Sequence, residues 1–455
     1  MKKIQELEYG DIGKLLWKQS VPAAIGMIIS SLYNIVDAIF IERGSGAIAL
    51  AGVFVTFPMF VMISSFSSMI GIGSASIISR ALGAKDREKV NKVLGNYLIL
   101  VCLSGIFVTI AGLFFLKPLL LLFGATPQIY EYAYSYMQVI FAGSFFYMFM
   151  TSSNALIRSE GGAKFAMALL VVSSVLNIPL DYLFIFPLKM GVAGAAIATI
   201  ISIFAGFLMT IYYFGFKETH LNFSDAVFKI DKGIIKEIFS VGSSIFTRQL
   251  AMSTRSVILN HSLAIYGGDL AIAAFGIMVN VFIFLSVPIF GLMQGMQPIA
   301  GYNYGAHKYS RLKEIIKKSI FWATVISVLS WIFLVFLPKP MAAIFTQNQE
   351  LLEKTIITIV ITSLLQPVVG FQMIVGSMYQ ALGKAKEALV VPLVRELIAL
   401  IPCIIILPKY FGFMGILIAF PVADFLGALV VYFFYKKEME KIDKKIELQA
   451  VANNS

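Results

Sequence analysis

The feature that most constrains this chain is a series of long apolar runs that recurs from one end to the other. A membrane-spanning helix needs about 20 mostly apolar residues, and charged loops and Gly/Pro breaks divide the sequence into twelve such runs. They lie near residues 15–41, 47–79, 93–116, 130–157, 163–187, 190–216, 237–265, 270–300, 315–337, 353–380, 387–408 and 411–435. Only 13% of the 455 residues are charged, against about 25% in soluble domains. We predict an all-α polytopic membrane protein with twelve transmembrane helices.

One polar connection is much longer than the others and separates two sets of six spans. It covers residues 217–236 and contains Lys217, Glu218, His220, Asp225, Asp231 and Lys232. The predicted organisation is an N-terminal six-helix bundle over residues 1–216 and a cytoplasmic linker over 217–236. A C-terminal six-helix bundle with a basic cytoplasmic tail follows over residues 237–455.

The two halves of the chain are copies of each other. The segment 158–164 (RSEGGAK) aligns with 380–386 (QALGKAK), and the same shift along the chain places Gly83-Ala84 on Gly305-Ala306. Each copy has an even number of spans, so both have the same topology, and parallel repeats of this kind are related by an axis along the membrane normal. We expect two bundles with pseudo-two-fold symmetry about that axis and a substrate path between them.

The distribution of Lys and Arg predicts the orientation. Of the 36 such residues, 27 lie in the termini and in the loops that follow even-numbered spans, and six lie in the loops on the other side. Positive residues accumulate in cytoplasmic loops, so we expect both termini in the cytoplasm and the protein in the cytoplasmic (inner) membrane. The formal charge of +11 is then an orientation signal, and no nucleic-acid partner is expected.

Two carboxyl groups lie inside predicted spans of the N-terminal half, Asp37 in the first span and Asp181 in the fifth. A charge there costs about 2.5–3.5 kcal/mol at a helix centre. Asn177 lies one turn before Asp181 on the same face, and Thr199 is the main hydroxyl in the middle of the sixth span. These oxygen atoms suit a hard monovalent cation such as Na⁺ and can equally hold a proton. The alternative is that each aspartate only bonds a neighbouring helix.

The C-terminal half lacks this set and carries other charges. Arg248 and Arg255 lie in the seventh span, Arg395 and Glu396 in the eleventh, and Asp424 in the twelfth. Structural ion pairs among them and a role in transport are both compatible with the sequence.

Polar side chains elsewhere in the spans are candidates for a substrate cavity, because lipid would leave their amides unpaired. Tyr33 and Asn34 lie one turn before Asp37 on its face. The full set of cavity candidates is Tyr33, Asn34, Asn154, Gln249, Asn280 and Gln294.

Several kinds of catalytic or energy-coupling site are missing from the sequence. There is no G-x-x-x-x-G-K-[ST] loop for nucleotide hydrolysis, and the three His and two Cys are scattered. We expect no enzyme, no cofactor and no need for an ATP-binding subunit. Active transport would have to use an ion gradient or the membrane potential.

The motifs Tyr33-Asn-Ile-Val-Asp37 and Asn177-x-x-x-Asp181, with Thr199 and twelve spans in two similar halves, resemble the multidrug and toxic compound extrusion (MATE) transporters. The resemblance covers almost the whole chain. It implies a secondary active antiporter, expected to be a monomer, that exports amphipathic cationic drugs in exchange for Na⁺ or H⁺ by alternating access. It also implies that Asp37, Asn177, Asp181 and Thr199 form the cation site.

One branch of that family also uses acidic residues in the seventh and tenth spans. Here the seventh span has Arg248 and Arg255, and the tenth has Gln366-Pro367 without a central acid. We therefore expect coupling in the first half of the chain.

Two other functions remain as alternatives. A lipid-linked saccharide flippase can share the two-bundle plan, and the second-half arginines would favour its pyrophosphate, although the first-half acids would oppose an anionic headgroup. A non-transporting receptor or intramembrane enzyme is the other, but neither requires a duplicated bundle.

Overall fold

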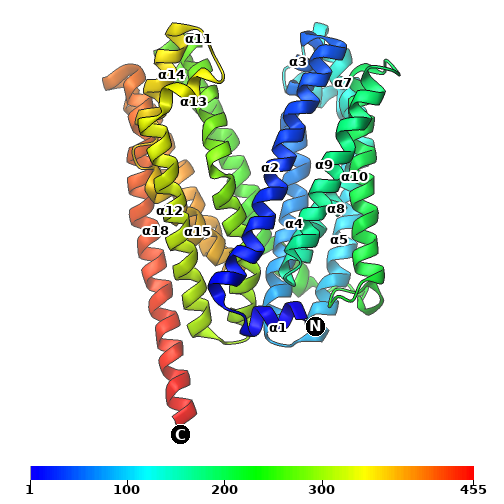
Figure 1. The fold of residues 1–455 in the computed structure, drawn as a ribbon, viewed down its shortest axis with the longest axis vertical. Helices are drawn as coiled ribbons and strands as arrows, with labels where there is room; N and C mark the ends of the chain where they lie inside the picture. The colour runs from blue at the N-terminus through cyan, green and yellow to red at the C-terminus, as the bar shows by residue number, and fades with distance from the viewer. Residues whose placement is uncertain (1, 455) are drawn as a thin grey trace. The chain divides into compact units, whose positions relative to one another are not determined.

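The computed structural model describes residues 2–454, and every regular element in that range is helical (Figure 1). The helices of the first half are α1 (Lys2–Tyr9), α2 (Ile12–Ser45), α3 (Ala47–Val55), α4 (Phe57–Gly83), α5 (Arg87–Phe114), α6 (Leu116–Leu122), α7 (Pro127–Ala142), α8 (Ser144–Ser159), α9 (Ala163–Ile185), α10 (Gly191–Phe216) and the short 3₁₀ turn η1 (Phe223–Asp225). Those of the second half are α11 (Lys232–Gly305), α12 (Tyr309–Phe336), α13 (Pro338–Ala343), α14 (Gln349–Thr362), α15 (Gln366–Ala381), α16 (Ala385–Leu393), the π-helical η2 (Val394–Ala399), α17 (Leu400–Ile406) and α18 (Pro408–Asn454).

These helices account for the twelve predicted spans. Between residues 2 and 454, nine helical segments are long and apolar enough to cross a membrane, and the 74-residue α11 contains two spans because its backbone breaks at Gly268. The remaining two spans are the helix pairs α7–α8 and α14–α15, bent by 58° and 57°. The protein is a multi-pass membrane protein with twelve membrane spans, six in each half, and two of the spans that the sequence predicts as continuous helices are bent.

The duplication extends to backbone conformation. Left-handed φ angles occur at Lys85 (57°) and His307 (56°), which occupy equivalent positions of the repeat in the turns after the second and eighth spans. Gly46 and Gly268 are equivalent in the same way, with φ of 90° and 68°. Residues with a side chain rarely adopt a positive φ. Because positive φ angles recur at equivalent positions, the two halves repeat their turns as well as their helices.

Contacts between Cα atoms divide the chain into two compact units. The first contains residues up to Gln5 and Pro22–Gly242, and the second contains Glu6–Val21 and the residues from Ser243 onward. Both boundaries cut a long helix, α2 at Pro22 and α11 at Gly242, and these two residues end the matching tripeptides Ser-Val-Pro and Ser-Val-Gly of the repeat. The first span of each half therefore begins inside the unit formed mainly by the other half.

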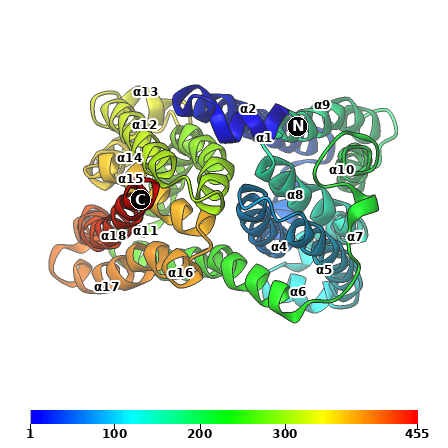
Figure 2. The ribbon, with the colours of Figure 1, turned by 90° about the horizontal axis from the view of Figure 1, so that it is seen from below.

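The interior of the first unit is built around α8, which contacts α4, α5, α9 and α10 (Figure 2). Small and hydroxyl residues allow close approach, as is common between membrane helices. A Cβ on Gly71 of α4 would lie only 2.7 Å from Cα of Ser152 on α8. The buried hydroxyl of Tyr97 on α5 bonds Ser152 and Ser153 at 2.8 and 2.7 Å.

The second unit has a large apolar cluster formed by α11, α14, α17 and α18, in which Phe275 packs on Phe420. The segment Glu6–Val21 belongs to this unit. Its Trp17 ring lies 5.1 Å from that of Trp322 on α12, and Glu8 forms an ion pair with Lys308 at 3.1 Å.

The connection between the halves is anchored on the first unit. Asn96 on α5 donates to the Lys229 carbonyl and accepts from the Asp231 amide, at 3.0 and 2.9 Å. Asp231 then accepts from the amides of Gly233 and Ile234, as an N-cap residue does. This cap explains why α11 begins at Lys232, inside the segment that the sequence predicts as linker.

Candidate cation and substrate site

Helix α9 places the amide of Asn177 and the carboxyl of Asp181 on one face. The two residues are one turn apart, and both are buried, with 1% and 0% of their surfaces exposed. Asn177 Nδ2 lies 3.3 Å from Asp181 Oδ1. Because the amide donates to the carboxylate, the two side chains form one polar group inside an apolar helix pair.

Helix α10 packs beside α9 (Figure 1) and carries the buried Thr199. Its buried face consists largely of small residues, among them Gly194, Ala195 and Ala198, which let α9 and α10 approach closely. Asn177 Nδ2 lies 3.4 Å from Thr199 Oγ1.

Helix α2 supplies Asp37. Its carboxyl group lies beside that of Asp181, close enough for the two to share a hydrogen bond when one is protonated. Three oxygen atoms in this group are buried and accept no hydrogen bond from the described residues: Asp37 Oδ1, Asp181 Oδ2 and Asn177 Oδ1. The structure thus brings together the four residues that the sequence predicts as a cation site, and their unused oxygens are available to a cation.

Tyrosine side chains lie within electrostatic range of the two acids. Tyr33 on α2 and Tyr136 on α7 both interact electrostatically with Asp37 and Asp181, and Tyr147 on α8 interacts with Tyr33. Sequence reasoning selected Tyr33 but missed Tyr136 and Tyr147. Nothing in the sequence distinguishes these two from packing aromatics, although both flank the bend between α7 and α8.

The predicted cavity residues of the first unit have different surroundings. Tyr33 is half-buried beside the acids, whereas Asn34 is exposed. Asn154 is buried and fully used in packing: it donates to the Ala166 carbonyl at 2.7 Å and accepts from Arg158 Nε at 2.8 Å.

The other cavity candidates lie on α11, in the second unit. Asn280 is exposed and donates to the Gly276 carbonyl of its own helix at 2.9 Å. Gln249 and Gln294 are half-buried. Gln297, one turn after Gln294 on α11, donates to Gln380 Oε1 at 2.9 Å.

The second unit does not repeat the acidic site. The positions equivalent to Asn177 and Asp181 in the second copy of the repeat are Ala399 and Cys403. No group of three His, Cys, Asp or Glu side chains suited to a metal ion occurs between residues 2 and 454.

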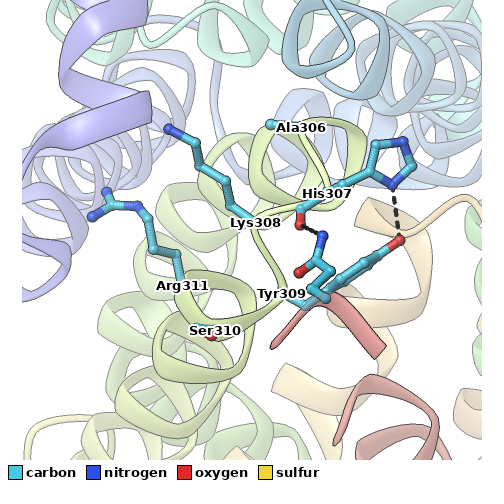
Figure 3. A pocket seen from close by; sticks show the side chains of 7 residues that line it. Ala306, His307, Lys308, Tyr309, Ser310 and Arg311 are labelled. Atoms are coloured by element: carbon cyan, nitrogen blue, oxygen red, sulfur yellow. Dashed lines mark hydrogen bonds between the residues drawn. The ribbon is translucent and has the colours of Figure 1, made fainter. Parts of the chain in front are cut away.

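A polar pocket of about 440 Å³ lies at the turn between α11 and α12 (Figure 3). Gln449 of α18 donates to the His307 carbonyl at 2.8 Å, and His307 Nδ1 lies 2.9 Å from the Tyr309 hydroxyl. Its basic residues already have partners, Lys308 with Glu8 and Arg311 with the Gly10 carbonyl. The hydrogen bond from Gln449 therefore links α18 to this turn, and the pocket does not include the residues of the acidic site.

Comparison with known proteins identifies the family. The family model MatE matches the chain twice, over residues 22–183 and 244–405. The two matches are of equal length, and the shift from one to the other is the shift that relates the two copies of the sequence repeat.

Relatives and solved structures agree with this match over nearly the full length. The multidrug export protein MepA of Staphylococcus aureus (strain MSSA476) is 29% identical over 431 residues, 94% of each chain. The MATE multidrug transporter DinF-BH, whose structure was solved as a complex, is 39% identical, with a TM-score of 0.86 over 93% of this chain and 95% of that one. A MATE crystal structure in a bent conformation has a TM-score of 0.92 at 29% identity and covers 98% and 99% of the two chains. The chain belongs to the MatE family, the MATE multidrug efflux transporters.

Proposed function

We propose that this protein is a secondary active antiporter that exports amphipathic cationic compounds in exchange for Na⁺ or H⁺. The observation that carries the proposal is the half-buried Asp37 beside the buried Asp181, whose partner Asn177 also bonds Thr199. The names of its relatives, a multidrug export protein and a multidrug transporter, support a small-molecule substrate.

The chemistry of the site favours a hard monovalent cation as the exchanged ion. Carboxylate, amide and hydroxyl oxygens are ligands that such cations prefer. Two carboxylates that lie side by side away from bulk water repel each other, so Na⁺ or a proton between Asp37 and Asp181 relieves that repulsion. Neutralisation would draw α2 towards α9 and α10.

Coupling requires that the ion bind one conformation better than another, because equal affinity shifts no equilibrium. In the proposed cycle, external cation enters the acidic pocket and the resulting movement of α2 lowers the affinity for the drug, which leaves outward. The protein then returns to a form open to the cytoplasm. Alternating access of this kind needs no cofactor and no ATP-binding subunit.

The orientation and assembly form part of the proposal. The excess of Lys and Arg in the termini and in alternate loops supports cytoplasmic termini in the cytoplasmic membrane. All four proposed cation ligands come from one unit of one chain, so a monomer is sufficient.

The test uses the purified full chain in proteoliposomes loaded with a fluorescent cationic dye. Dye efflux is measured separately under a pure sodium gradient and a pure proton gradient, with an ionophore holding the membrane potential at zero. Acceleration by one gradient and not by the other identifies the coupling ion. Equal efflux with and without either gradient would contradict ion-coupled export, and flipping of a labelled isoprenoid lipid by the same vesicles would favour a flippase.

A further inference from the structure

A chain of ion pairs crosses the second unit. Arg255 on α11 donates to Glu396 Oε2 at 2.6 Å, and Arg395 donates to Glu396 Oε1 at 2.7 Å. Arg395 also pairs with Asp424 on α18. The two acids, Glu396 and Asp424, are thereby balanced by two arginines, Arg255 and Arg395. Ion pairs among these charged residues were one of the two possibilities that the sequence left open.

Arg248 takes no part in this series of ion pairs. It lies two helical turns before Arg255 on α11. Within residues 2–454 no side chain or carbonyl accepts a hydrogen bond from it, and its Nε is buried without a partner. The acid that interacts with it electrostatically is Glu396, which already binds two other arginines.

The charges of this region therefore do not balance. Three arginines face two acids, which leaves one positive charge on a membrane-spanning helix. An arginine at a helix centre costs about 2.5–3.5 kcal/mol, and intramembrane charges normally have partners. An uncompensated guanidinium is poorly explained by packing alone.

The backbone beside these residues is also irregular. Arg395 and Glu396 lie in the π-helical segment η2, which interrupts the eleventh span between α16 and α17. Such segments are uncommon in helices and are frequently found at functional sites. A second buried and unpartnered donor, Arg255 Nε, lies in the same region.

We propose that Arg248, assisted by Arg255, binds the carboxylate of an amphipathic monoanion or zwitterion. The single excess charge matches a monoanion, and a planar guanidinium can bind a carboxylate through two parallel hydrogen bonds. Met252 lies between Arg248 and Arg255 on the same face of α11 and is only half-buried, so an apolar side chain adjoins the charged groups. The substrates would then include compounds with a carboxylate, in addition to the cations bound near the acidic pair.

A binding experiment tests this proposal without relying on transport. The full chain in lipid nanodiscs is titrated with 1-pyrenebutyrate and with 1-pyrenebutanol, which has the same apolar body without the charge, and protein-free nanodiscs provide the blank. We expect the carboxylate to bind at least about tenfold more tightly than the alcohol, a difference of about 1.4 kcal/mol. Equal affinity for the two probes would overturn the proposal whatever the variants do.

Two variants locate the site. Arg248→Gln should abolish the preference for the carboxylate, whereas Arg248→Lys should keep part of it because a charge remains. The exposed Arg87→Gln, in the other unit, serves as a matched loss of one arginine and should leave the preference unchanged. If Arg248→Gln retained the full preference, or Arg87→Gln abolished it, Arg248 would not be the binding group. A failure of ion-coupled efflux would leave these binding results intact, so the two proposals can fail independently.

Discussion

Asn177 on α9 directs its amide nitrogen towards Thr199 on α10, with Nδ2 3.4 Å from Oγ1. The same nitrogen lies 3.3 Å from Asp181 Oδ1, so the donor side of the amide is fully committed. The amide oxygen is consequently turned away from both and is buried without a donor among the described residues. This geometry leaves the Asn177 oxygen free to act as a ligand in the proposed cation site.

Removing either carboxylate should uncouple export from the ion gradient. We expect Asp37→Asn and Asp181→Asn each to lower ion-driven dye efflux at least about tenfold, because a single remaining carboxylate no longer needs a cation to relieve repulsion. The measurement is efflux from proteoliposomes under the coupling gradient. Asp225→Asn, in the exposed 3₁₀ turn, is the matched control, and unchanged coupling in Asp37→Asn would remove that residue from the mechanism.

Thr199→Val should weaken the site without destroying it. Valine has nearly the shape of threonine but lacks the hydroxyl, so one oxygen ligand and one acceptor for Asn177 are lost. We expect a several-fold increase in the cation concentration that gives half-maximal efflux, with a smaller change in the maximal rate. Ser202, one turn further along α10, bonds the Ala198 carbonyl of its own helix, so Ser202→Ala should leave the half-maximal concentration unchanged.

The ion pairs of the second unit should contribute to stability, in contrast to Arg248. Arg395→Gln leaves the almost fully buried Asp424 without its partner, and breaking a buried pair costs about 3–5 kcal/mol. We expect a clear fall in the Tm measured by intrinsic fluorescence in detergent, partly reversed in Arg395→Gln/Asp424→Asn. Arg248→Gln should not lower Tm, because this side chain has no hydrogen-bond partner within residues 2–454 to lose.

The contact between Glu8 and Lys308 should make stability depend on pH. Burial alone would raise the pKa of Glu8, but hydrogen bonds from Lys308 and Tyr9 hold it below the ordinary value of 4.5. A carboxyl group whose pKa is lower in the folded than in the unfolded state stabilises the fold at pH values above its unfolded-state pKa. That stabilisation is lost as the pH falls through its folded-state pKa. The Tm difference between the wild type and Glu8→Gln should therefore be largest near neutral pH and shrink below about pH 4.5. A difference that grows on acidification would contradict this assignment.

The twelve spans could be predicted because bilayer thickness demands long apolar runs, which are visible in any sequence. Bends within a run were not visible: Gly143 between α7 and α8 resembles many other glycines that do not interrupt a helix. The start of α11 depended on a cap at Asp231, one of several polar residues in the same segment.

The acidic site was partly predictable for a related reason. Asp37, Asn177 and Asp181 are conspicuous because polar groups inside an apolar span are costly. Tyr136 and Tyr147 are not conspicuous, since aromatic residues are expected there whatever their role. The ion pairs of the second unit depend on which helices meet, and the sequence left them undecided.

The division of α2 and α11 between the two units has a practical consequence for dissecting the molecule. If the chain were cut within the 217–231 connection, the N-terminal fragment would lack Lys232–Gly242, which belongs to its own compact unit. It would also carry Glu6–Val21, which belongs to the compact unit of the other fragment. Severed halves should consequently be recovered as a stable complex when they are produced together and should aggregate when either is produced alone.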